Sequence, residues 1–361
     1  MDGIINIYKE KGYTSFDVVA KLRGILKMKK IGHTGTLDPD AEGVLPVCIG
    51  SATKLCDMLT DRSKEYLAVL RLGIVTDTQD MTGTVLQSKE AVSDEALVKQ
   101  AVLSFVGEYD QIPPMYSALK VNGQKLCDMA RQGKEIERKP RRVTIHKLEI
   151  MEMELPLVTM RVHCSKGTYI RTLCHDIGQK LGCGGCMQSL VRTRVSEFTL
   201  DKALTLSQIE SLRDGGRLAE CIHPVDMVFS AFPAFRVRPE AQRLLDNGNP
   251  LKAGQTVCVE RGTAGNLKPG GIASTADKYA GEDANACAGE AANAYAGEAA
   301  NAYIAGTYTA EVNDKDAAGA QSALPVDGGQ VRMYHSDGRF CGIYVFQAQS
   351  LMLKPVKIFA L

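Results

Sequence analysis

The chain has 361 residues, of which 45% are hydrophobic and 24% charged, and a formal net charge of +1. It is long enough for one large and one smaller domain. No apolar run of about 18 residues occurs, which excludes a membrane-spanning helix. The segment MDGIINIYKEKGYTS also lacks the pattern of a secretory signal. We therefore expect a cytoplasmic protein whose eleven scattered cysteines are reduced.

The small net charge hides a segregation of charged side chains. Residues 261–325 hold four basic and eight acidic residues, which leaves 39 basic and 34 acidic residues in the rest of the chain. Two basic clusters in that remainder suit phosphate backbones, although charge alone favours a solvated surface. The clusters comprise Lys21, Arg23, Lys27, Lys29 and Lys30, and Arg131, Lys134, Arg138, Lys139, Arg141, Arg142 and Lys147.

In chain order, the first expected element is a helix over residues 16–30, with Ser15 as its N-cap. Its apolar residues recur at helical spacing at Phe16, Val19, Leu22 and Leu26. The glycine-rich stretch GHTGTLDPDAEGVLPVCIG follows at 32–50. A short helix is then expected over 52–59, and a strand that ends in a polar turn over 64–78.

A second long helix is expected over residues 94–107, with Ser93 as its cap and one apolar face. That face comprises Leu97, Ala101, Val102 and Phe105. Residues 157–164 alternate as a half-buried strand and lead into a helix over 168–182. Because strands and helices mix without strict alternation, we expect an α+β fold with a mixed, largely antiparallel sheet flanked by helices.

The composition changes after about residue 230. Between Tyr279 and Tyr303 an eight-residue unit repeats as AGEDANAC, AGEAANAY and AGEAANAY, which holds few large apolar groups to bury. The segments on either side look like pieces of one small β-rich domain. We therefore expect a first domain over 1–230 and a second over 231–361, interrupted by an insertion at about 261–325.

Several motifs that could carry chemistry are incomplete. The glycine-rich stretch lacks both Gly-Lys-Ser/Thr and GxGxxG, so it is not a phosphate-binding loop. A glycosidase needs two carboxylates, and nothing singles out Asp80 or Glu65 as the second. Cys183 and Cys186 have the spacing of a zinc or redox site but lack a second pair. We expect neither a metal nor a cofactor.

Taken together, four segments resemble one known family. They are GIINIYKEKGYTS, GHTGTLDPDAEGVLPVCIGSATK, KEY with the later TDTQDMTG, and SKGTYIRTLCHDIGQKLG. In this order, over roughly residues 3–200, they resemble the bacterial tRNA pseudouridine-55 synthases of the TruB family. The resemblance implies a catalytic domain over 1–230 and a PUA-like RNA-binding domain over 231–361. It implies isomerisation of uridine 55 in the tRNA T-arm, without cofactor, membrane or obligate protein partner, by a monomer.

The resemblance assigns the catalytic roles to three residues. Asp38 would be the essential carboxylate, acting as nucleophile or base toward the ribose. Tyr66 would pack on the target base, close to the proton that moves. Arg171 would form an ion pair with Asp38. The residue types agree with this chemistry, because a carboxylate in an apolar pocket stays ionised only beside a cation, and a guanidinium fork matches it.

The resemblance also implies residues that bind the substrate, because the target base must leave its stack before reaction. His33 would contact the surroundings of the flipped nucleotide, while Tyr169 and Leu190 would line the uracil pocket with Tyr66. Lys9 and Asp80 match family positions with supporting roles.

Four positions depart from the family pattern. Glu10 stands where proline is usual, Cys186 where histidine is common, Val191 where arginine is common, and Ser196 where glycine is usual. The last three lie near Leu190, so RNA contacts there could be weaker or rearranged. Two alternatives stay open: a guide-dependent relative with the same core, and a non-catalytic tRNA chaperone.

Overall fold

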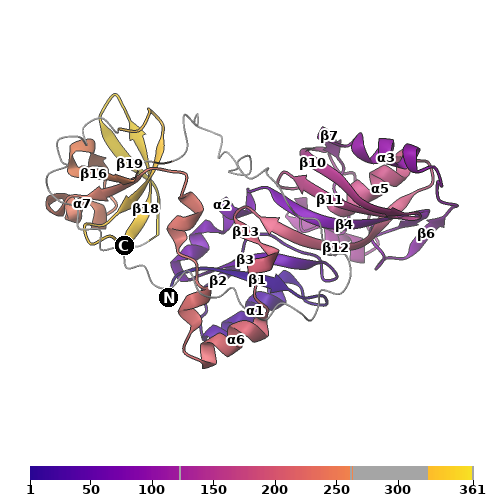
Figure 1. Cartoon of the computed structure of the whole chain (residues 1–361), viewed down its shortest axis with the longest axis horizontal. Helices are drawn as coiled ribbons and strands as arrows, with labels where there is room; N and C mark the ends of the chain where they lie inside the picture. Colours follow the sequence, from indigo (N-terminus) through magenta and orange to yellow (C-terminus); the bar gives the residue numbers. More distant parts are fainter. Residues whose placement is uncertain (122, 261, 263–323, 360–361) are drawn as a thin grey trace. The chain divides into compact units, whose positions relative to one another are not determined.

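The computed structural model describes residues 1–121, 123–260, 262 and 324–359. It divides into two compact units, Met1–Cys221 and Ile222–Leu361 (Figure 1). The octapeptide repeats, with nearly all of the predicted insertion, lie outside the described residues. Within the described ranges no helix is both long and apolar enough to cross a membrane.

A single nine-stranded sheet dominates the described part of the first unit. Its main path runs β1-β3-β12-β4-β11-β10-β7, with β2 paired to β3 and β13 paired to β12. Every pair is antiparallel except β3 with β12, which is parallel. The prediction of a mixed, largely antiparallel sheet is confirmed. The strands are β1 Gly3–Lys9, β2 Ile31–His33, β3 Glu42–Ile49, β4 Lys64–Leu72, β7 Gly107–Gln111, β10 Arg141–Glu154, β11 Leu157–Cys164, β12 Gly185–Val195 and β13 Phe198–Thr199.

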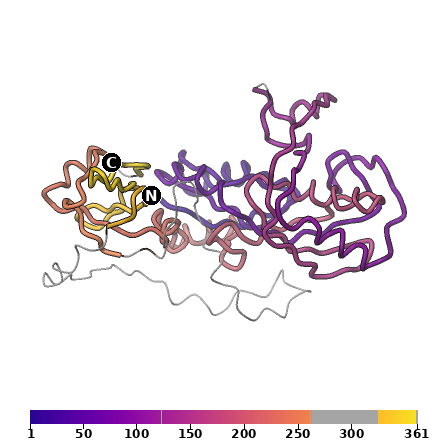
Figure 2. Tube along the Cα trace, turned by 90° about the horizontal axis from the view of Figure 1, so that it is seen from above, coloured from indigo at the N-terminus to yellow at the C-terminus, as the bar shows by residue number. Residues whose placement is uncertain are grey.

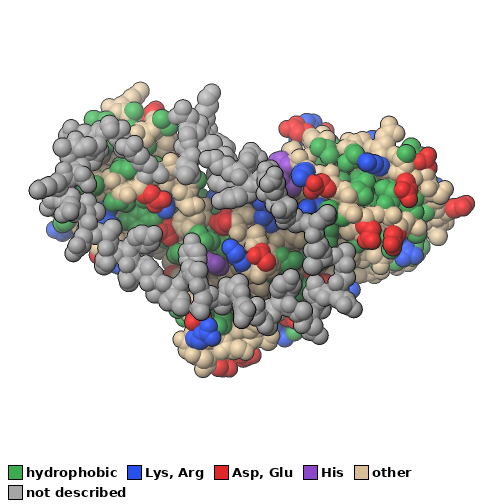
Figure 3. Space-filling model, viewed as in Figure 1, with side chains coloured by type: hydrophobic (Ala, Val, Ile, Leu, Met, Phe, Trp, Pro, Cys, Tyr) green, Lys and Arg blue, Asp and Glu red, His purple; other side chains and the backbone are tan. Residues whose placement is uncertain are grey.

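Helices cover one face of these strands. Strand β11 buries every second residue, as predicted, and helix α5 (Ile170–Lys180) packs against the same core. Helix α3 (Glu95–Leu103) lies beside α5 on this face (Figure 1). Figure 3, in the view of Figure 1, shows apolar and charged side chains mixed on the described surface of this unit. The side chains that meet in the core include Leu70, Val158, Met160, Val162, Leu173 and Ile177.

The first predicted helix is α1, Ser15–Leu26, but its N-cap is Thr14 and not Ser15. The Thr14 hydroxyl accepts from the Asp17 amide at 3.0 Å, and the Asp17 carboxylate accepts from the Thr14 amide at 2.8 Å. This capping box starts the helix one residue earlier than predicted. The face that packs on the core also differs from the predicted one, because Phe16 is 63% exposed. The buried side chains are Ser15, Val18, Val19, Leu22 and Ile25.

The N-cap of α3 is likewise Asp94 and not Ser93. Its carboxylate accepts from the amides of Ala96 and Leu97 at 2.9 and 3.1 Å. Leu97 is 46% exposed, and Val98 takes its place in the core. The remaining short helical segments of this unit are η1 Gly50–Leu55, α2 Cys56–Thr60, α4 Leu126–Arg131, η2 Leu200–Lys202, α6 Leu206–Asp214 and η3 Leu218–Cys221.

Two hairpins lie apart from the large sheet. Strands β5 (Ile74–Thr76) and β6 (Val85–Ser88) form one of them, and β8 (Lys120–Val121) and β9 (Gln124–Lys125) form the other. Figure 2 shows the purple segment that holds β8, β9 and α4 projecting from the body of the unit. Met115, Leu126 and Met129 give this projection a small core of its own.

The second unit is rich in strands, and its six-stranded sheet has the order β15-β19-β18-β17-β14-β16. The segment η4 (Val225–Phe229) belongs to this compact unit, because the Tyr334 hydroxyl donates to Asp226 at 2.6 Å and Phe229 stacks on Phe340. Its other elements are β14 Ala234–Val237, η5 Pro239–Ala241, α7 Gln242–Asp246, β15 Leu251–Lys252, η6 Ala253–Gln255, β16 Thr256–Glu260, β17 Gln330–Tyr334, β18 Phe340–Gln347 and β19 Met352–Ile358.

Candidate active site

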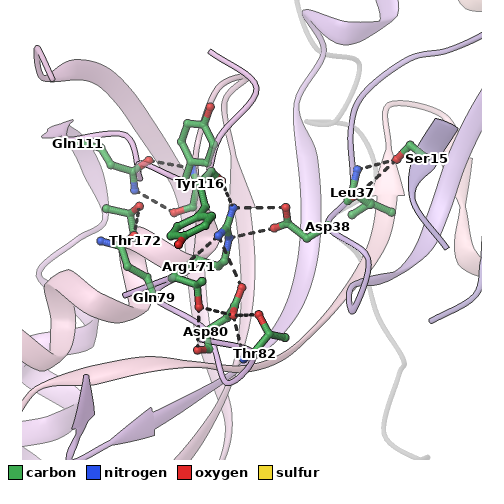
Figure 4. Close-up of polar contacts among 12 residues, drawn as sticks. Ser15, Leu37, Asp38, Gln79, Asp80, Thr82, Gln111, Tyr116, Arg171 and Thr172 are labelled. Atoms are coloured by element: carbon green, nitrogen blue, oxygen red, sulfur yellow. Dashed lines mark hydrogen bonds and ion pairs between the residues drawn. The ribbon is translucent and has the colours of Figure 1, made fainter. Parts of the chain in front are cut away.

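Asp38 lies in the loop between β2 and β3, within the glycine-rich stretch. Ser15, the first residue of α1, fixes the preceding residue of this loop. Its hydroxyl accepts from the Leu37 amide at 2.9 Å and donates to the Leu37 carbonyl at 3.4 Å (Figure 4). Ser15 is therefore a buried anchor of the loop that carries Asp38, which explains why its hydroxyl does not cap the helix.

Lys9, at the end of β1, holds the other side of the loop. Its ammonium donates to the carbonyls of Ala41 at 2.5 Å and Pro39 at 3.1 Å. The side chain is fully buried, and this burial lowers the pKa of Lys9 to about 8, although the nearby Glu42 and Asp38 carboxylates oppose the shift. Lys9 thus shapes the loop backbone by donating to its carbonyl groups.

Asp38 and Arg171 form a two-point ion pair. The Arg171 Nε lies 2.9 Å from Oδ2 of Asp38, and Nη2 donates to Oδ1 at 3.3 Å. The Arg171 side chain is only 6% exposed, whereas that of Asp38 is 39% exposed. Burial raises the pKa of Asp38, and the Arg171 guanidinium opposes this rise. The carboxylate is therefore anchored on one side and open on the other.

Three further groups fix the Arg171 guanidinium, which projects from the first turn of α5. Nη1 donates to the Thr78 carbonyl at 3.0 Å and lies 3.6 Å from the Asp80 carboxylate, while Nη2 donates to the Tyr116 carbonyl at 2.9 Å (Figure 4). Asp80 is itself held, since it accepts from the Thr82 hydroxyl at 2.6 Å. The planar fork consequently has little freedom to turn away from Asp38.

The start of α5 is fastened from outside the helix. Tyr169, its N-cap, makes no capping bond with its own side chain. The side-chain amide of Gln111 instead accepts from the Tyr169 amide at 2.8 Å and donates to the Tyr169 carbonyl at 3.0 Å (Figure 4). One residue past Arg171, the Thr172 hydroxyl donates to the Gln79 side chain at 2.7 Å.

Tyr66 and Leu190 belong to the apolar cluster beside this ion pair. They lie on the neighbouring strands β4 and β12, and they are 8% and 7% exposed. Burial raises the pKa of Tyr66 to about 12, with a small contribution from the charge of Asp38. His33, at the end of β2, accepts from the Gly35 amide at 3.3 Å, and burial lowers its pKa.

The structure thus brings the predicted residues together in different ways. Asp38, Asp80 and Arg171 are in direct polar contact, whereas Lys9 acts on the loop backbone. The site combines an anchored carboxylate with buried aromatic and aliphatic side chains. Across the described part of the chain, no three His, Cys, Asp or Glu side chains are grouped to hold a metal ion.

Two family models match this chain, and together they span most of the residues of the site. The N-terminal domain of TruB family pseudouridylate synthases matches residues 23–170, and the C-terminal domain of tRNA pseudouridylate synthase B matches residues 171–230. The tRNA pseudouridine synthase B of Lachnoclostridium phytofermentans is 60% identical over 260 residues, which cover 70% of this chain and 84% of that protein. The chain belongs to the TruB family. It is therefore an RNA pseudouridine synthase, an isomerase.

Further relatives agree with TruB membership. The tRNA pseudouridine synthase B of Alkaliphilus oremlandii is 48% identical over 270 residues, covering 72% of this chain and 89% of that protein. Among solved structures, a Cbf5-Nop10-Gar1 complex contains a chain with a TM-score of 0.63 at 23% identity, covering 99% of this chain and 84% of that one. An H/ACA RNP bound to a substrate RNA gives the same TM-score at 21% identity, covering 99% of this chain and 85% of that one. These structures share the fold.

The structure gives a physical setting for three departures from the TruB pattern. Ser196 has a φ of +52° in the turn between β12 and β13, a conformation that glycine adopts without strain. Cys186 is buried, with its sulfur 3.4 Å from that of Met81. Val191 is half-buried on β12, where it pairs with Glu42 of β3 and Leu67 of β4. None of the three belongs to the polar contacts of Asp38.

Several contributors to this TruB site were not identified from the sequence. Ser15 was assigned to a helix cap, and Thr78, Gln111 and Tyr116 received no role. The contribution of Tyr116 is a backbone carbonyl, which no sequence pattern reveals. For Ser15 a signal did exist, because Thr14 and Asp17 form a capping box three residues apart and free Ser15 from that task.

Proposed function

We propose that this chain converts uridine 55 in the T-arm of tRNA to pseudouridine. The observation that carries the proposal is the two-point ion pair between Asp38 and Arg171, beside a cluster with Tyr66 and Leu190. The relatives named tRNA pseudouridine synthase B support tRNA as the substrate. The family resemblance of the sequence motifs supports position 55.

The reaction needs no electron donor or acceptor. The bond between ribose C1′ and N1 of uracil breaks, the base turns, and a bond forms between C1′ and C5. The C5 hydrogen leaves as a proton, and N1 gains one, so the product is an isomer of the substrate. In this scheme Asp38 acts on the ribose as nucleophile or base, and Arg171 favours its ionised form.

The apolar cluster would receive the extruded base. Extrusion costs a few kcal/mol, and stacking and hydrogen bonds in the pocket offset it. Tyr66 would stack on the uracil, and Leu190 and Tyr169 would line the pocket. His33, which accepts from the Gly35 amide, would contact the surrounding nucleotide. Asp80 and Lys9 would support the site through Arg171 and the loop backbone.

Binding of the rest of the RNA would involve the basic clusters and the β-rich second unit, which we expect to be PUA-like. Part of the second cluster is already neutralised, because Arg142 pairs with Asp110 and Glu108 at 2.7 and 3.2 Å. Arg131 and Arg138 also have acidic partners. The charge available to phosphates is therefore smaller than the count of basic residues.

The test of the proposed reaction is Asp38→Asn on a T-arm stem-loop. Activity is measured as tritium released from uridine labelled at C5, because only formation of the new bond removes that hydrogen. We expect a loss of more than about 1,000-fold, since the amide can serve neither as nucleophile nor as base. Asp40→Asn is the control, because the Asp40 carboxylate lies in the same loop and is 52% exposed. A near wild-type rate for Asp38→Asn would refute the catalytic assignment.

The same assay separates the alternatives. Wild-type protein that binds tRNA but releases no tritium from any tRNA would be a chaperone. Activity that requires an added guide RNA would place it with the guide-dependent relatives. We propose that the purified chain acts alone as a monomer. The supporting observation is its 60% identity to a tRNA pseudouridine synthase B, compared with 21–23% to the chains of Cbf5 and H/ACA complexes. Light scattering of the active fraction tests the monomer.

A further inference from the structure

A second arginine is buried close to the site, on strand β12. Arg192 is 2% exposed, and its Nε donates to the Val44 carbonyl of β3 at 2.7 Å. Its Nη2 donates to the Gly35 carbonyl at 3.3 Å. Gly35 lies in the loop that carries Asp38, three residues before it. One guanidinium therefore ties this loop to two strands of the sheet.

The surroundings of Arg192 contain no acidic partner. Among the described residues, no Asp or Glu forms an ion pair with it, which is uncommon because a buried charge without compensation is costly. Its polar neighbours also include the hydroxyl of Tyr66, with which it interacts electrostatically. Arg192 and Tyr66 are direct partners across the antiparallel pair of β12 and β4.

The backbone around Arg192 is also closely packed. Gly43 of β3 has a φ of +105°, and a Cβ at that position would overlap the Arg192 carbonyl. The main chain of β12 is therefore held against β3, and the side chain leaves it in a fixed direction. The planar Arg192 guanidinium can reach acceptors that lie on different elements, whereas the ammonium of a lysine is a point charge that could not reach all of them at once.

We propose that Arg192 is a positioning residue that fixes the Tyr66 hydroxyl and the Gly35 turn at the pocket for the target base. This inference rests on the proposed function, because it presumes that Tyr66 meets the uracil. It assigns Arg192 no contact with RNA. We therefore expect that loss of the Arg192 guanidinium slows the chemical step while the affinity for RNA stays nearly unchanged.

The test compares Arg192→Lys with Arg194→Lys. Arg194 is the matched control, because it lies on the same strand, is 31% exposed and pairs with Glu65. For Arg192→Lys we expect kcat to fall by about 10- to 100-fold with KM within about threefold, since small displacements of catalytic groups have effects of this size. For Arg194→Lys we expect kcat within about twofold of wild type.

Hydrogen exchange gives a readout that does not require activity. In Arg192→Lys we expect the amides of residues 34–41 to exchange about tenfold faster than in wild type, and those of the Arg194→Lys control to be unchanged. If the lysine variant does not fold, Arg192→Gln, which keeps a donor without the charge, is measured in the same way.

Several results would overturn the inference. For Arg192→Lys, these are a kcat within twofold of wild type, an effect on KM alone, or unchanged hydrogen exchange in residues 34–41. An equal loss of kcat in Arg194→Lys would also overturn it. A wild-type protein that forms no pseudouridine would instead refute the proposed function. The exchange comparison would then decide alone whether Arg192 holds the loop.

Discussion

Two buried arginines anchor two regions of the site by different means. Arg171 projects from helix α5 and meets two carboxylates, Asp38 and Asp80. Arg192 projects from strand β12 and meets two carbonyls and the Tyr66 hydroxyl. Both belong to the first unit, and both contact the loop between β2 and β3, at Asp38 and at Gly35.

The difference follows from what each arginine holds. The group that Arg171 holds is ionised, so its partner must carry the opposite charge and match its two oxygens. The groups that Arg192 holds are neutral, and a buried donor network fixes their direction without adding a second ion. The Asp38 region should therefore respond to changes of charge and pH, and the Tyr66 region to changes of donor geometry.

Arg171→Met should have the largest effect. It leaves the carboxylates of Asp38 and Asp80 without their cation, and breaking a buried pair in this way costs about 3–5 kcal/mol of the free energy of unfolding. We expect activity on the stem-loop to fall by more than about 100-fold. Urea unfolding at pH 7 and pH 5 measures the stability, and the loss should shrink at pH 5 as Asp38, whose pKa is raised by burial, becomes protonated.

The control for this change is Arg161→Met. The Arg161 side chain is 41% exposed and lies 3.9 Å from Glu149, so its loss should change the free energy of unfolding by less than about 1 kcal/mol. An Arg171→Met protein as stable and active as wild type would show that the ion pair does not organise the Asp38 region.

The same division explains how much could be read from the sequence. The β11 alternation and the helical periodicity of α5 are local, and both predictions are confirmed. The predicted N-caps and buried faces of α1 and α3 were partly wrong, since the caps are Thr14 and Asp94 and both Phe16 and Leu97 are exposed. Apolar residues occur on more than one face of each helix, so hydrophobic spacing alone does not decide which of them pack on the core.

The site itself depends on pairs that are distant in sequence. Asp38 and Arg171 are separated by 133 positions, and only the family resemblance of their motifs connected them. Arg192 was assigned no role from the sequence, since an arginine side chain is usually solvated. Its burial follows from the parallel pairing of β12 with β3, which arises from tertiary structure.

Gln111→Ala should have an intermediate effect, because it acts on Arg171 through the backbone. The Gln111 side chain is 1% exposed, and its removal leaves the Tyr169 amide without its partner, at a cost of about 1–3 kcal/mol in the free energy of unfolding, while the Tyr169 carbonyl still accepts from the Leu173 amide. We expect kcat to fall by about tenfold. Gln179→Ala, at an exposed position of the same helix, is the control. Equal kcat values for the two variants would exclude Gln111 from the positioning of α5.

Lys9 offers the finest test, because it is a cation of the site that can lose its proton. Burial lowers its pKa to about 8, from an ordinary value of 10.5. Between these values the unfolded chain binds more protons than the folded one at this position, so the free energy of unfolding should rise with pH. A pKa shift of this size corresponds to a change of about 3 kcal/mol in the free energy of unfolding across this pH range.

The comparison with Lys9→Met isolates this contribution, because the other titrating groups are common to both proteins. Urea unfolding between pH 7.5 and pH 10.5 should show wild type gaining stability relative to the variant as pH rises. Parallel curves would mean that Lys9 is not desolvated in the folded protein. A rise that disappears in Lys9→Met assigns this pH dependence to Lys9 and not to Arg171 or Arg192, because both arginines are common to the two proteins.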